Sequence, residues 1–315
     1  MLRSEIKTVV LAGAGVMGSS LAQIFAKHGY RSVLYDINQK SIDKAQELIS
    51  INQKSLMTQG ELTLKQSESV MSRISFDMSI NCFENADFVL ETIVENMDVK
   101  HKFWREVSPM VGEDVVLTTN TSGLSISAIA DAVHKPERFA GMHWVNPPHL
   151  IPLVEVIGGE KTAVQTLDII RQLADTLERK HVSIHNDPPG FLFNRLQFAV
   201  VREALHIVEN GWATMEDVDN VMKYGLGMRY ACIGPFETMD FGGIDTFTRV
   251  ASYLFGQLNS SADVPDLLQK IYEEGRYGLK SGRGFYDYSG NKAANAISQR
   301  DAKFMKVSKC LFGCE

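Results

Sequence analysis

The chain has 315 residues, of which 44% are hydrophobic and 22% are charged, and its formal net charge is −6. This length suffices for two domains, and the composition is that of an ordinary soluble globular protein. The negative balance argues against a general nucleic-acid or membrane-surface role, and no apolar run approaches the ~20 residues of a bilayer-spanning helix.

The chain begins with a predicted βαβ unit. Residues 7–15, "KTVVLAGAG", predict a buried strand rather than a signal peptide, because the apolar run continues into glycines without a cleavage pattern. Apolar residues at helical spacing then lead to Gly29, and residues 31–36 predict a second strand. Such a unit implies a parallel sheet.

A glycine motif joins the first strand to the first helix. It has the pattern GxGxxG and consists of Gly13, Gly15, Val16, Met17 and Gly18, with Ala14 between the first two glycines. Asp36 ends the second strand. This context predicts dinucleotide binding, with the pyrophosphate at the helix N-terminus.

Asp36 also predicts which dinucleotide binds. Its carboxylate would accept hydrogen bonds from the ribose hydroxyls and repel a 2′-phosphate, and no arginine follows it directly, so we expect NAD rather than NADP. The open alternative is that Asp36 only caps the loop.

Alternating helices and strands continue up to residue 159. Helices are predicted around Ile42, Ala45, Ile49 and Leu56, then over 62–74 and 98–111. Strands are predicted at 87–95, 114–122, 138–145 and 153–159. The alternation predicts an α/β fold, with an N-terminal Rossmann-type doubly wound sheet.

The segment "HNDPPGF", residues 185–191, marks a domain boundary by its prolines and glycine. Beyond it, residues 191–211 have helical spacing, and Thr214 and Asp217 form a capping-box pattern before a helix expected to close at Gly225. We therefore expect an all-helical C-terminal domain. The predicted parts are an NAD-binding domain at 1–186, a helical substrate and dimerisation domain at 187–290, and a tail at 291–315.

The tail is predicted from composition alone. Residues 289–301 resemble a loose linker before a short basic helix.

The four cysteines, Cys82, Cys232, Cys310 and Cys314, form no dense framework, which predicts reduced thiols in a cytoplasmic protein. Cys310 and Cys314 are spaced as CxxxC, a weak basis for a metal site, and no metal is expected.

The segment "HWVNPPHLIPLVEVI", residues 143–157, carries the chemistry. It places His143 at the end of one strand and Glu155 inside the next, across a turn stiffened by three prolines. A histidine exchanges protons near neutral pH, and a carboxylate on its far ring nitrogen would fix its tautomer. These residues predict an acid–base pair for a hydride-transfer reaction.

The chain resembles the L-3-hydroxyacyl-CoA dehydrogenase family, including the bacterial 3-hydroxybutyryl-CoA dehydrogenases. The resemblance lies in "GAGVMG", "ETIVENMDVK", "NTSGLSISAIA", "RFAGMHWVNPP", "LVEVIGG", "DPPGFLFNR", "IGPFETMDFGGIDT" and "GLKSGRGFYDY", which occur in this order up to Tyr288. It implies NAD as the cofactor, a small-molecule substrate, and a homodimer formed through the helical domain.

The resemblance also implies the roles of individual residues. The implied catalytic residues are His143, Glu155, Ser122 and Asn194. The implied cofactor-side residues, besides the glycine motif and Asp36, are Glu95, Lys100, Asn120, Ser122, Asn146 and Lys280.

Each of these residues has a simpler interpretation. His143 could be a hydrogen-bonded core histidine, and Glu155 a solvated strand residue. Ser122 could cap the helix that begins near "SISAIA". Asn194 could lie on a helix surface, and Lys100 and Lys280 could be solvated like most lysines.

The chain departs from the family pattern at several positions, which leaves the substrate open. Gly123 stands where a second serine is common, and Pro152 where a lysine is common. "NRLQFA", "GLGMRYACIGPFETM" and the tail resemble the branch of L-gulonate 3-dehydrogenase, its lens-crystallin relative and carnitine dehydrogenase. Those relatives oxidise free 3-hydroxy acids, whose carboxylate Arg229 could bind. The open alternative is that Arg229 only holds a helix turn together.

We therefore expect oxidation of a short-chain 3-hydroxyacyl-CoA, with a free 3-hydroxy acid as the alternative. Early helix lysines, Lys40, Lys44 and Lys54, could meet CoA phosphates or simply be solvated. A non-catalytic NAD-binding structural protein is the alternative of another class, disfavoured because the acid–base pair is intact. A metalloenzyme is disfavoured because no HExxH motif occurs, and His181 and His185 lack supporting ligands.

Overall fold

The computed structural model describes residues 6–58 and 60–313. The chain forms two compact units, Met1–Arg195 and Leu196–Glu315, which are described separately. Cys314, half of the CxxxC pair, lies outside the described residues.

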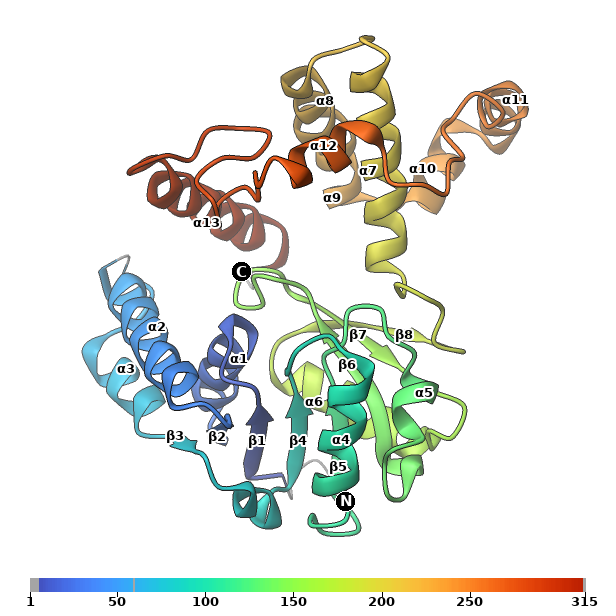
Figure 1. Cartoon of the computed structure of the whole chain (residues 1–315). Coiled ribbons are helices and arrows are strands. Elements are labelled where there is room, and N and C mark those ends of the chain that lie inside the picture. The colour runs from blue at the N-terminus through green and yellow to red at the C-terminus, as the bar shows by residue number, and fades with distance from the viewer. Residues whose placement is uncertain (1–5, 59, 314–315) are drawn as a thin grey trace. The chain divides into compact units, whose positions relative to one another are not determined.

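An eight-stranded sheet forms the centre of the first unit, in the order β3-β2-β1-β4-β5-β6-β7-β8 (Figure 1). The strands are β1 (Thr8–Ala12), β2 (Arg31–Tyr35), β3 (Ile74–Asp77), β4 (Phe88–Glu91), β5 (Val116–Thr119), β6 (Phe139–Trp144), β7 (Leu153–Ile157) and β8 (Lys180–Ile184). All neighbouring strands are parallel except β6 and β7, which are antiparallel. The predicted Rossmann-type fold is confirmed.

Helices cover both faces of the sheet, as a doubly wound fold requires. They are α1 (Val16–Lys27), α2 (Gln39–Thr58), α3 (Leu64–Met71), α4 (Met97–Val107), α5 (Ile126–Ala130) and α6 (Val164–Thr176), with short 3₁₀ turns at Ile80–Asn85 and Pro136–Arg138. One buried cluster joins α1, α2 and α6 to one face, and a second joins α4 and α5 to the other (Figure 1).

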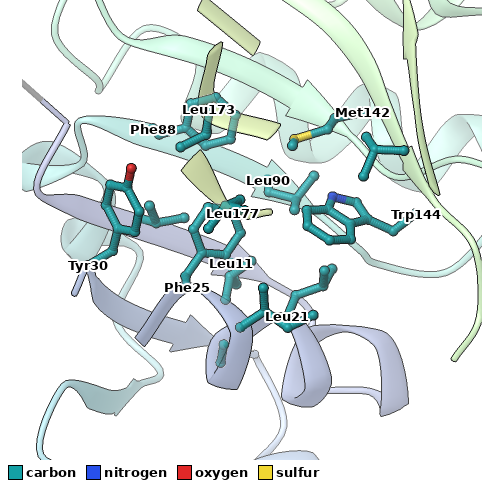
Figure 2. Close-up of a cluster of buried hydrophobic side chains, with 14 of the residues drawn as sticks. Leu11, Leu21, Phe25, Tyr30, Phe88, Leu90, Met142, Trp144, Leu173 and Leu177 are labelled. Atoms are coloured by element: carbon teal, nitrogen blue, oxygen red, sulfur yellow. The ribbon is translucent and has the colours of Figure 1, made fainter. Parts of the chain in front are cut away.

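The first cluster fixes the strand that carries His143. Figure 2 shows Trp144, from β6, together with Leu21 and Phe25 of α1 and Leu90 of β4. Its ring lies 6.3 Å from that of Phe25, which in turn lies 6.4 Å from that of Phe88. Because side chains alternate along a strand, this anchoring directs the neighbouring His143 to the opposite face.

Most predicted elements of the first unit are present, with shorter strands. The strand predicted at 87–95 ends at Glu91, and the one predicted at 114–122 ends at Thr119, because the chain leaves the sheet there for loops. The helix predicted over 62–74 ends at Met71 and is followed by β3, which was not predicted. Leu56 is only half-buried, and Gln53 is buried instead, bonded to Gln23 and Ser67.

The second unit is helical. After α7 (Phe193–Glu209), which begins in the first unit, it contains α8 (Met215–Val221), a π-helical turn (Met222–Leu226), α9 (Gly227–Cys232), α10 (Pro235–Gly242), α11 (Ile244–Leu254), α12 (Asp266–Glu273) and α13 (Lys292–Phe312). An open cavity of ≈ 610 Å³ is lined mainly by apolar side chains of α7, α8 and α12. Among the described helices, none combines the length and the apolar character that spanning a bilayer requires.

Two predictions for the second unit need correction. The capping box of Thr214 and Asp217 is confirmed, but the helical run does not close at Gly225 and passes through the π-helical turn into α9. The predicted linker at 289–301 is wrong, because α13 begins at Lys292. Its alanines and charged residues favour a helix intrinsically, and this outweighs the loop-like composition of the first few residues.

Candidate active site

The glycine loop has the geometry of a dinucleotide cradle. Gly13 has φ = 107°, a conformation that favours glycine, and its N–H donates to the carbonyl of Tyr35 at 2.8 Å. A Cβ on Gly18 would stand 1.9 Å from the carbonyl oxygen of Gly13, so only glycine allows α1 to pack this closely. A Cβ on Gly15 would meet no atom within 4 Å, so the backbone there is open to a ligand.

Val16 and Met17 begin α1 directly after the loop. The orphan N–H groups of this helix start and its partial positive charge suit a pyrophosphate. The residues present therefore fit the phosphate part of NAD.

Asp36 follows β2 and is hydrogen-bonded to the glycine loop. One carboxylate oxygen accepts from the N–H of Ala14 at 2.9 Å, and the other accepts from the N–H of Asn38 at 2.9 Å. Asp36 thus does stabilise the loop, as the alternative interpretation held. A carboxylate has about four acceptor positions, so two remain for ribose hydroxyls, and the two roles are compatible.

His143 and Glu155 form a buried hydrogen-bonded pair. They are register partners across the antiparallel β6–β7 pair, so their side chains project from the same face. His143 Nδ1 lies 2.7 Å from Glu155 Oε2, and the residues are 4% and 0% exposed. The interpretation of Glu155 as a solvated strand residue is therefore wrong.

The other oxygen of Glu155 is held by the beginning of α7. Oε1 accepts from the N–H groups of Leu192 at 2.9 Å and Phe193 at 2.8 Å. Burial acts to raise the pKa of Glu155, but the hydrogen bonds from His143 and from these two N–H groups outweigh it and hold the pKa below its ordinary value. The pair therefore contains a carboxylate anion beside an imidazole.

Phe191 closes this face of the pair. It is fully buried, and its ring centroid lies 5.7 Å from that of His143. Its φ of 52° is unusual for a bulky residue, and Asn186 (62°) and Asp187 (30°) in the same segment also have positive φ. Asp187 Oδ2 accepts from Ser125 Oγ at 2.7 Å and from the N–H of Ser127 at 2.9 Å, which fixes this segment against α5.

Ser122 and Asn194 also lie together. Asn194 Nδ2 donates to the carbonyl of Ser122 at 2.8 Å, so the start of α7 is tied to the loop after β5. The N-cap of α5 is Ser125, not Ser122, so the interpretation of Ser122 as the helix cap is wrong. Asn120 lies in the same loop, and its Oδ1 accepts from the N–H of Trp144 at 2.8 Å.

Glu95 and Lys100 lie beside this loop. Glu95 Oε1 accepts from the N–H of Ser122 at 2.8 Å. Lys100 is 1% exposed and ion-paired, so the interpretation of a solvated lysine is wrong for it. Its main partner is Glu91, a fully buried residue that sequence reasoning missed, although a carboxylate inside an apolar strand was a signal.

The remaining predicted residues are not joined to this group. Asn146 is exposed, just after β6. Lys280 and Arg229 are exposed in the second unit, and their roles stay predictions. Within residues 6–58 and 60–313, no group of three or more His, Cys, Asp or Glu side chains could hold a metal ion.

Comparisons with known proteins cover nearly the whole chain. The family model "3-hydroxyacyl-CoA dehydrogenase, NAD binding domain" matches residues 8–187, and "3-hydroxyacyl-CoA dehydrogenase, C-terminal domain" matches residues 190–288. A probable 3-hydroxybutyryl-CoA dehydrogenase from Bacillus subtilis is 37% identical over 285 residues, covering 90% of this chain and 98% of the relative.

A second type of relative matches over a longer stretch. The 5-formyl-3-hydroxy-2-methylpyridine 4-carboxylate 5-dehydrogenase of Mesorhizobium japonicum is 33% identical over 310 residues, covering 98% of this chain and 100% of the relative. A crystal structure of an enzyme with this activity, described as an NAD⁺-dependent dismutase, superposes with a TM-score of 0.90 at 33% identity, covering 98% of this chain and 100% of that one. The (S)-3-hydroxybutyryl-CoA dehydrogenase of Ralstonia eutropha has a TM-score of 0.74 at 32% identity, covering 91% and 100%.

Proposed function

The chain belongs to the 3-hydroxyacyl-CoA dehydrogenase family, and from this premise we propose that His143 and Glu155 are the acid–base pair that removes the proton of a substrate hydroxyl group. The chain is an NAD-dependent oxidoreductase acting on a hydroxyl group. The observation that carries the proposal is the buried 2.7 Å hydrogen bond between His143 Nδ1 and Glu155 Oε2.

This hydrogen bond sets the proton on one ring nitrogen. An anionic carboxylate only accepts, so the neutral imidazole carries its hydrogen on Nδ1 and a lone pair on Nε2. Nε2 takes the hydroxyl proton, and Glu155 stabilises the imidazolium that results. When bound, NAD supplies the acceptor for the hydride. Ser122 and Asn194 are the proposed polar contacts of the reacting oxygen.

The first candidate substrate is a short-chain 3-hydroxyacyl-CoA, which would give the 3-ketoacyl-CoA. Both halves of the chain match models named for this activity, and the relative from Bacillus subtilis supports it.

The second candidate is a hydroxy compound with a free carboxylate, such as L-gulonate or carnitine. It is favoured by the Mesorhizobium japonicum relative, named for a pyridine carboxylate, whose match covers 98% of this chain. The family models end at residue 288, before α13, and the 285-residue match to Bacillus subtilis covers only 90% of the chain. Arg229, exposed in α9, is the proposed partner of the carboxylate.

The test is NAD reduction by the purified protein with 3-hydroxybutyryl-CoA, L-gulonate and carnitine, each at several concentrations. We expect the highest kcat/KM with the thioester. Activity with a free acid and none with the thioester would replace the first candidate by the second. A protein that binds NAD but reduces it with none of these compounds would contradict both candidate substrates.

Asp36 is expected to decide between NAD and NADP. Asp36→Ala should raise the Kd for NAD about ten-fold or more, because a hydrogen bond to a charged group contributes about 1.5–3 kcal/mol. Asp36→Asn is the matched variant, because it keeps an acceptor for the N–H of Ala14 and removes the charge that repels a 2′-phosphate. Fluorescence titration with NADH and NADPH measures both affinities, and an unchanged preference in both variants would contradict the assignment.

The partner proposed for the helical unit is a second copy of the chain. Among residues 196–311, Leu205 and Ile271 are the buried apolar side chains, whereas Phe236 and Phe241 of α10 are 77% and 80% exposed. Apolar surface of this kind is typical of an interface. Light scattering after size-exclusion chromatography should give twice 35.1 kDa, and a mass of 35.1 kDa at micromolar concentration would contradict the dimer. A cytoplasmic location also stays a prediction.

A further inference from the structure

A chain of three ionisable side chains lies beneath the loop that carries Ser122. Glu91 is at the end of β4, Lys100 is in the first turns of α4, and Glu95 is in the loop between these elements. Lys100 Nζ lies 2.6 Å from Glu91 Oε1 and 3.5 Å from Glu95 Oε2. The Glu91 and Lys100 side chains are 0% and 1% exposed, whereas that of Glu95 is 45% exposed.

Glu91 is fixed at both of its oxygens. Oε1 accepts from Lys100 Nζ and from the N–H of Ile93 at 2.8 Å, and Oε2 accepts from Thr119 Oγ1 at 2.7 Å. Its backbone carbonyl accepts from the N–H of Asn120 at 2.7 Å. The carboxylate therefore connects the ends of β4 and β5 and has few orientations left. Its position determines where the ammonium of Lys100 lies.

Glu95 connects the Lys100 ammonium to the loop that contains Ser122. Its Oε1 accepts from Thr121 Oγ1 at 2.6 Å and from the N–H of Ser122 at 2.8 Å. The carbonyl of Ser122 is held by Asn194. The N–H of Ser122 is therefore hydrogen-bonded to the Glu95 carboxylate, which is ion-paired with the buried ammonium of Lys100.

The free-energy cost of burying two charges argues against a purely structural role for the Glu91–Lys100 pair. Removing two charges from water costs several kcal/mol each, and replacing a buried ion pair by neutral residues is often neutral or stabilising. Support of the sheet end alone therefore does not require a charged pair at this position. What the charged pair adds is a fixed cation within reach of Glu95.

We propose that Glu91 is a positioning residue of the dehydrogenase, which acts through Lys100 and Glu95 to hold the Ser122 loop in its reactive position. The proposal rests on the proposed function, since it gives Ser122 a place at the reacting oxygen. Because Glu91 is fully buried, we place it outside direct contact with substrate and cofactor.

The first experiment separates positioning from stability. It compares Lys100→Met, the double variant Glu91→Gln/Lys100→Met, and the control Lys102→Met, an exposed lysine of the same helix. Lys100→Met leaves a buried carboxylate unpaired and should lower the Tm. The double variant removes both charges, keeps acceptors and donors for Ile93 and Thr119, and should recover most of that loss. Its kcat should nevertheless stay at least about ten-fold below that of the wild type.

Recovery of both Tm and kcat in the double variant would overturn the proposal, because the pair would then be structural only. If the Lys100 variants fail to fold, a second cycle decides the question. Glu91→Gln and Glu95→Gln each keep hydrogen-bonding capacity, and their effects on kcat should not multiply, because both act on the same contact to Ser122. Effects that multiply would show that Glu91 does not act through Glu95.

A measurement without substrate distinguishes this proposal from the proposed function. Hydrogen–deuterium exchange of residues 119–124 should be faster in Glu91→Gln than in the wild type and unchanged in Lys102→Met. Unchanged exchange in Glu91→Gln would overturn the positioning role, whichever substrate the wild type accepts. Failure of the wild type on every substrate, with faster exchange in Glu91→Gln, would contradict only the proposed function.

Discussion

Replacing His143 with alanine is expected to lower kcat by about 10²–10⁴-fold, the usual contribution of acid–base catalysis. The imidazole is the group beside Glu155 that can take up the hydroxyl proton near neutral pH, and alanine leaves no acceptor in its place. The glycine loop and Asp36 are unchanged in this variant, so the Kd for NAD should stay within about two-fold of the wild-type value. Steady-state kinetics and an NADH titration measure the two quantities.

The matched control is His185→Ala, which removes an exposed histidine from the same unit. It should keep wild-type turnover. A His143→Ala protein with most of the wild-type kcat would remove this residue from the mechanism. Loss of NAD binding together with turnover would point instead to a collapse of the first unit, which thermal unfolding detects.

Replacing Glu155 with glutamine is expected to lower kcat by about 10²-fold or more. The glutamine oxygen can still accept from the N–H groups of Leu192 and Phe193, but its NH₂ group would face His143 Nδ1. The imidazole would then carry its hydrogen on Nε2, and this nitrogen could not take the substrate proton. Glu160→Gln, at an exposed position, is the control and should be fully active.

The Glu155→Gln variant also tests how the stability of the protein depends on pH. The pKa of Glu155 is lowered in the folded protein, so its ionisation stabilises the fold above the ordinary pKa of a glutamate. That contribution is lost as the pH falls through the folded-state pKa. The Tm difference between wild type and Glu155→Gln should therefore be largest near neutral pH and shrink below about pH 4. A difference that does not vary with pH would contradict this account.

Sequence alone predicted the parts of the molecule in which local pattern and tertiary packing agree. The GxGxxG loop has a strand before it, a helix after it and Asp36 at the end of the next strand, and each element is formed as expected. The pairing of His143 with Glu155 was predictable because the connection between their strands, residues 145–152, is stiffened by prolines and leaves few registers.

The rest depended on contacts that the local pattern does not contain. β3 is formed by the four-residue segment "ISFD", which becomes a strand because β2 offers it an edge and because Ile74 and Phe76 pack against the core. The local pattern around Lys100 is that of an ordinary helix lysine, and only the fold brings its Nζ 2.6 Å from Glu91 Oε1. α13 was predicted as a linker over its first turns because a loop-like composition was weighed above helix propensity.

The carboxylate of Glu155 has a consequence for folding as well as for chemistry. It accepts from the first N–H groups at the start of α7 and also from the imidazole, so nucleation of that helix and assembly of the reactive pair are coupled equilibria. A change that unfolds the first turn of α7 must also weaken the hydrogen bond between Glu155 and His143. A ligand that fixes the His143 ring must in turn protect the Leu192 and Phe193 amides from exchange. A mutation far from the active site should therefore change the turnover rate and the exchange protection of the Leu192 and Phe193 amides together.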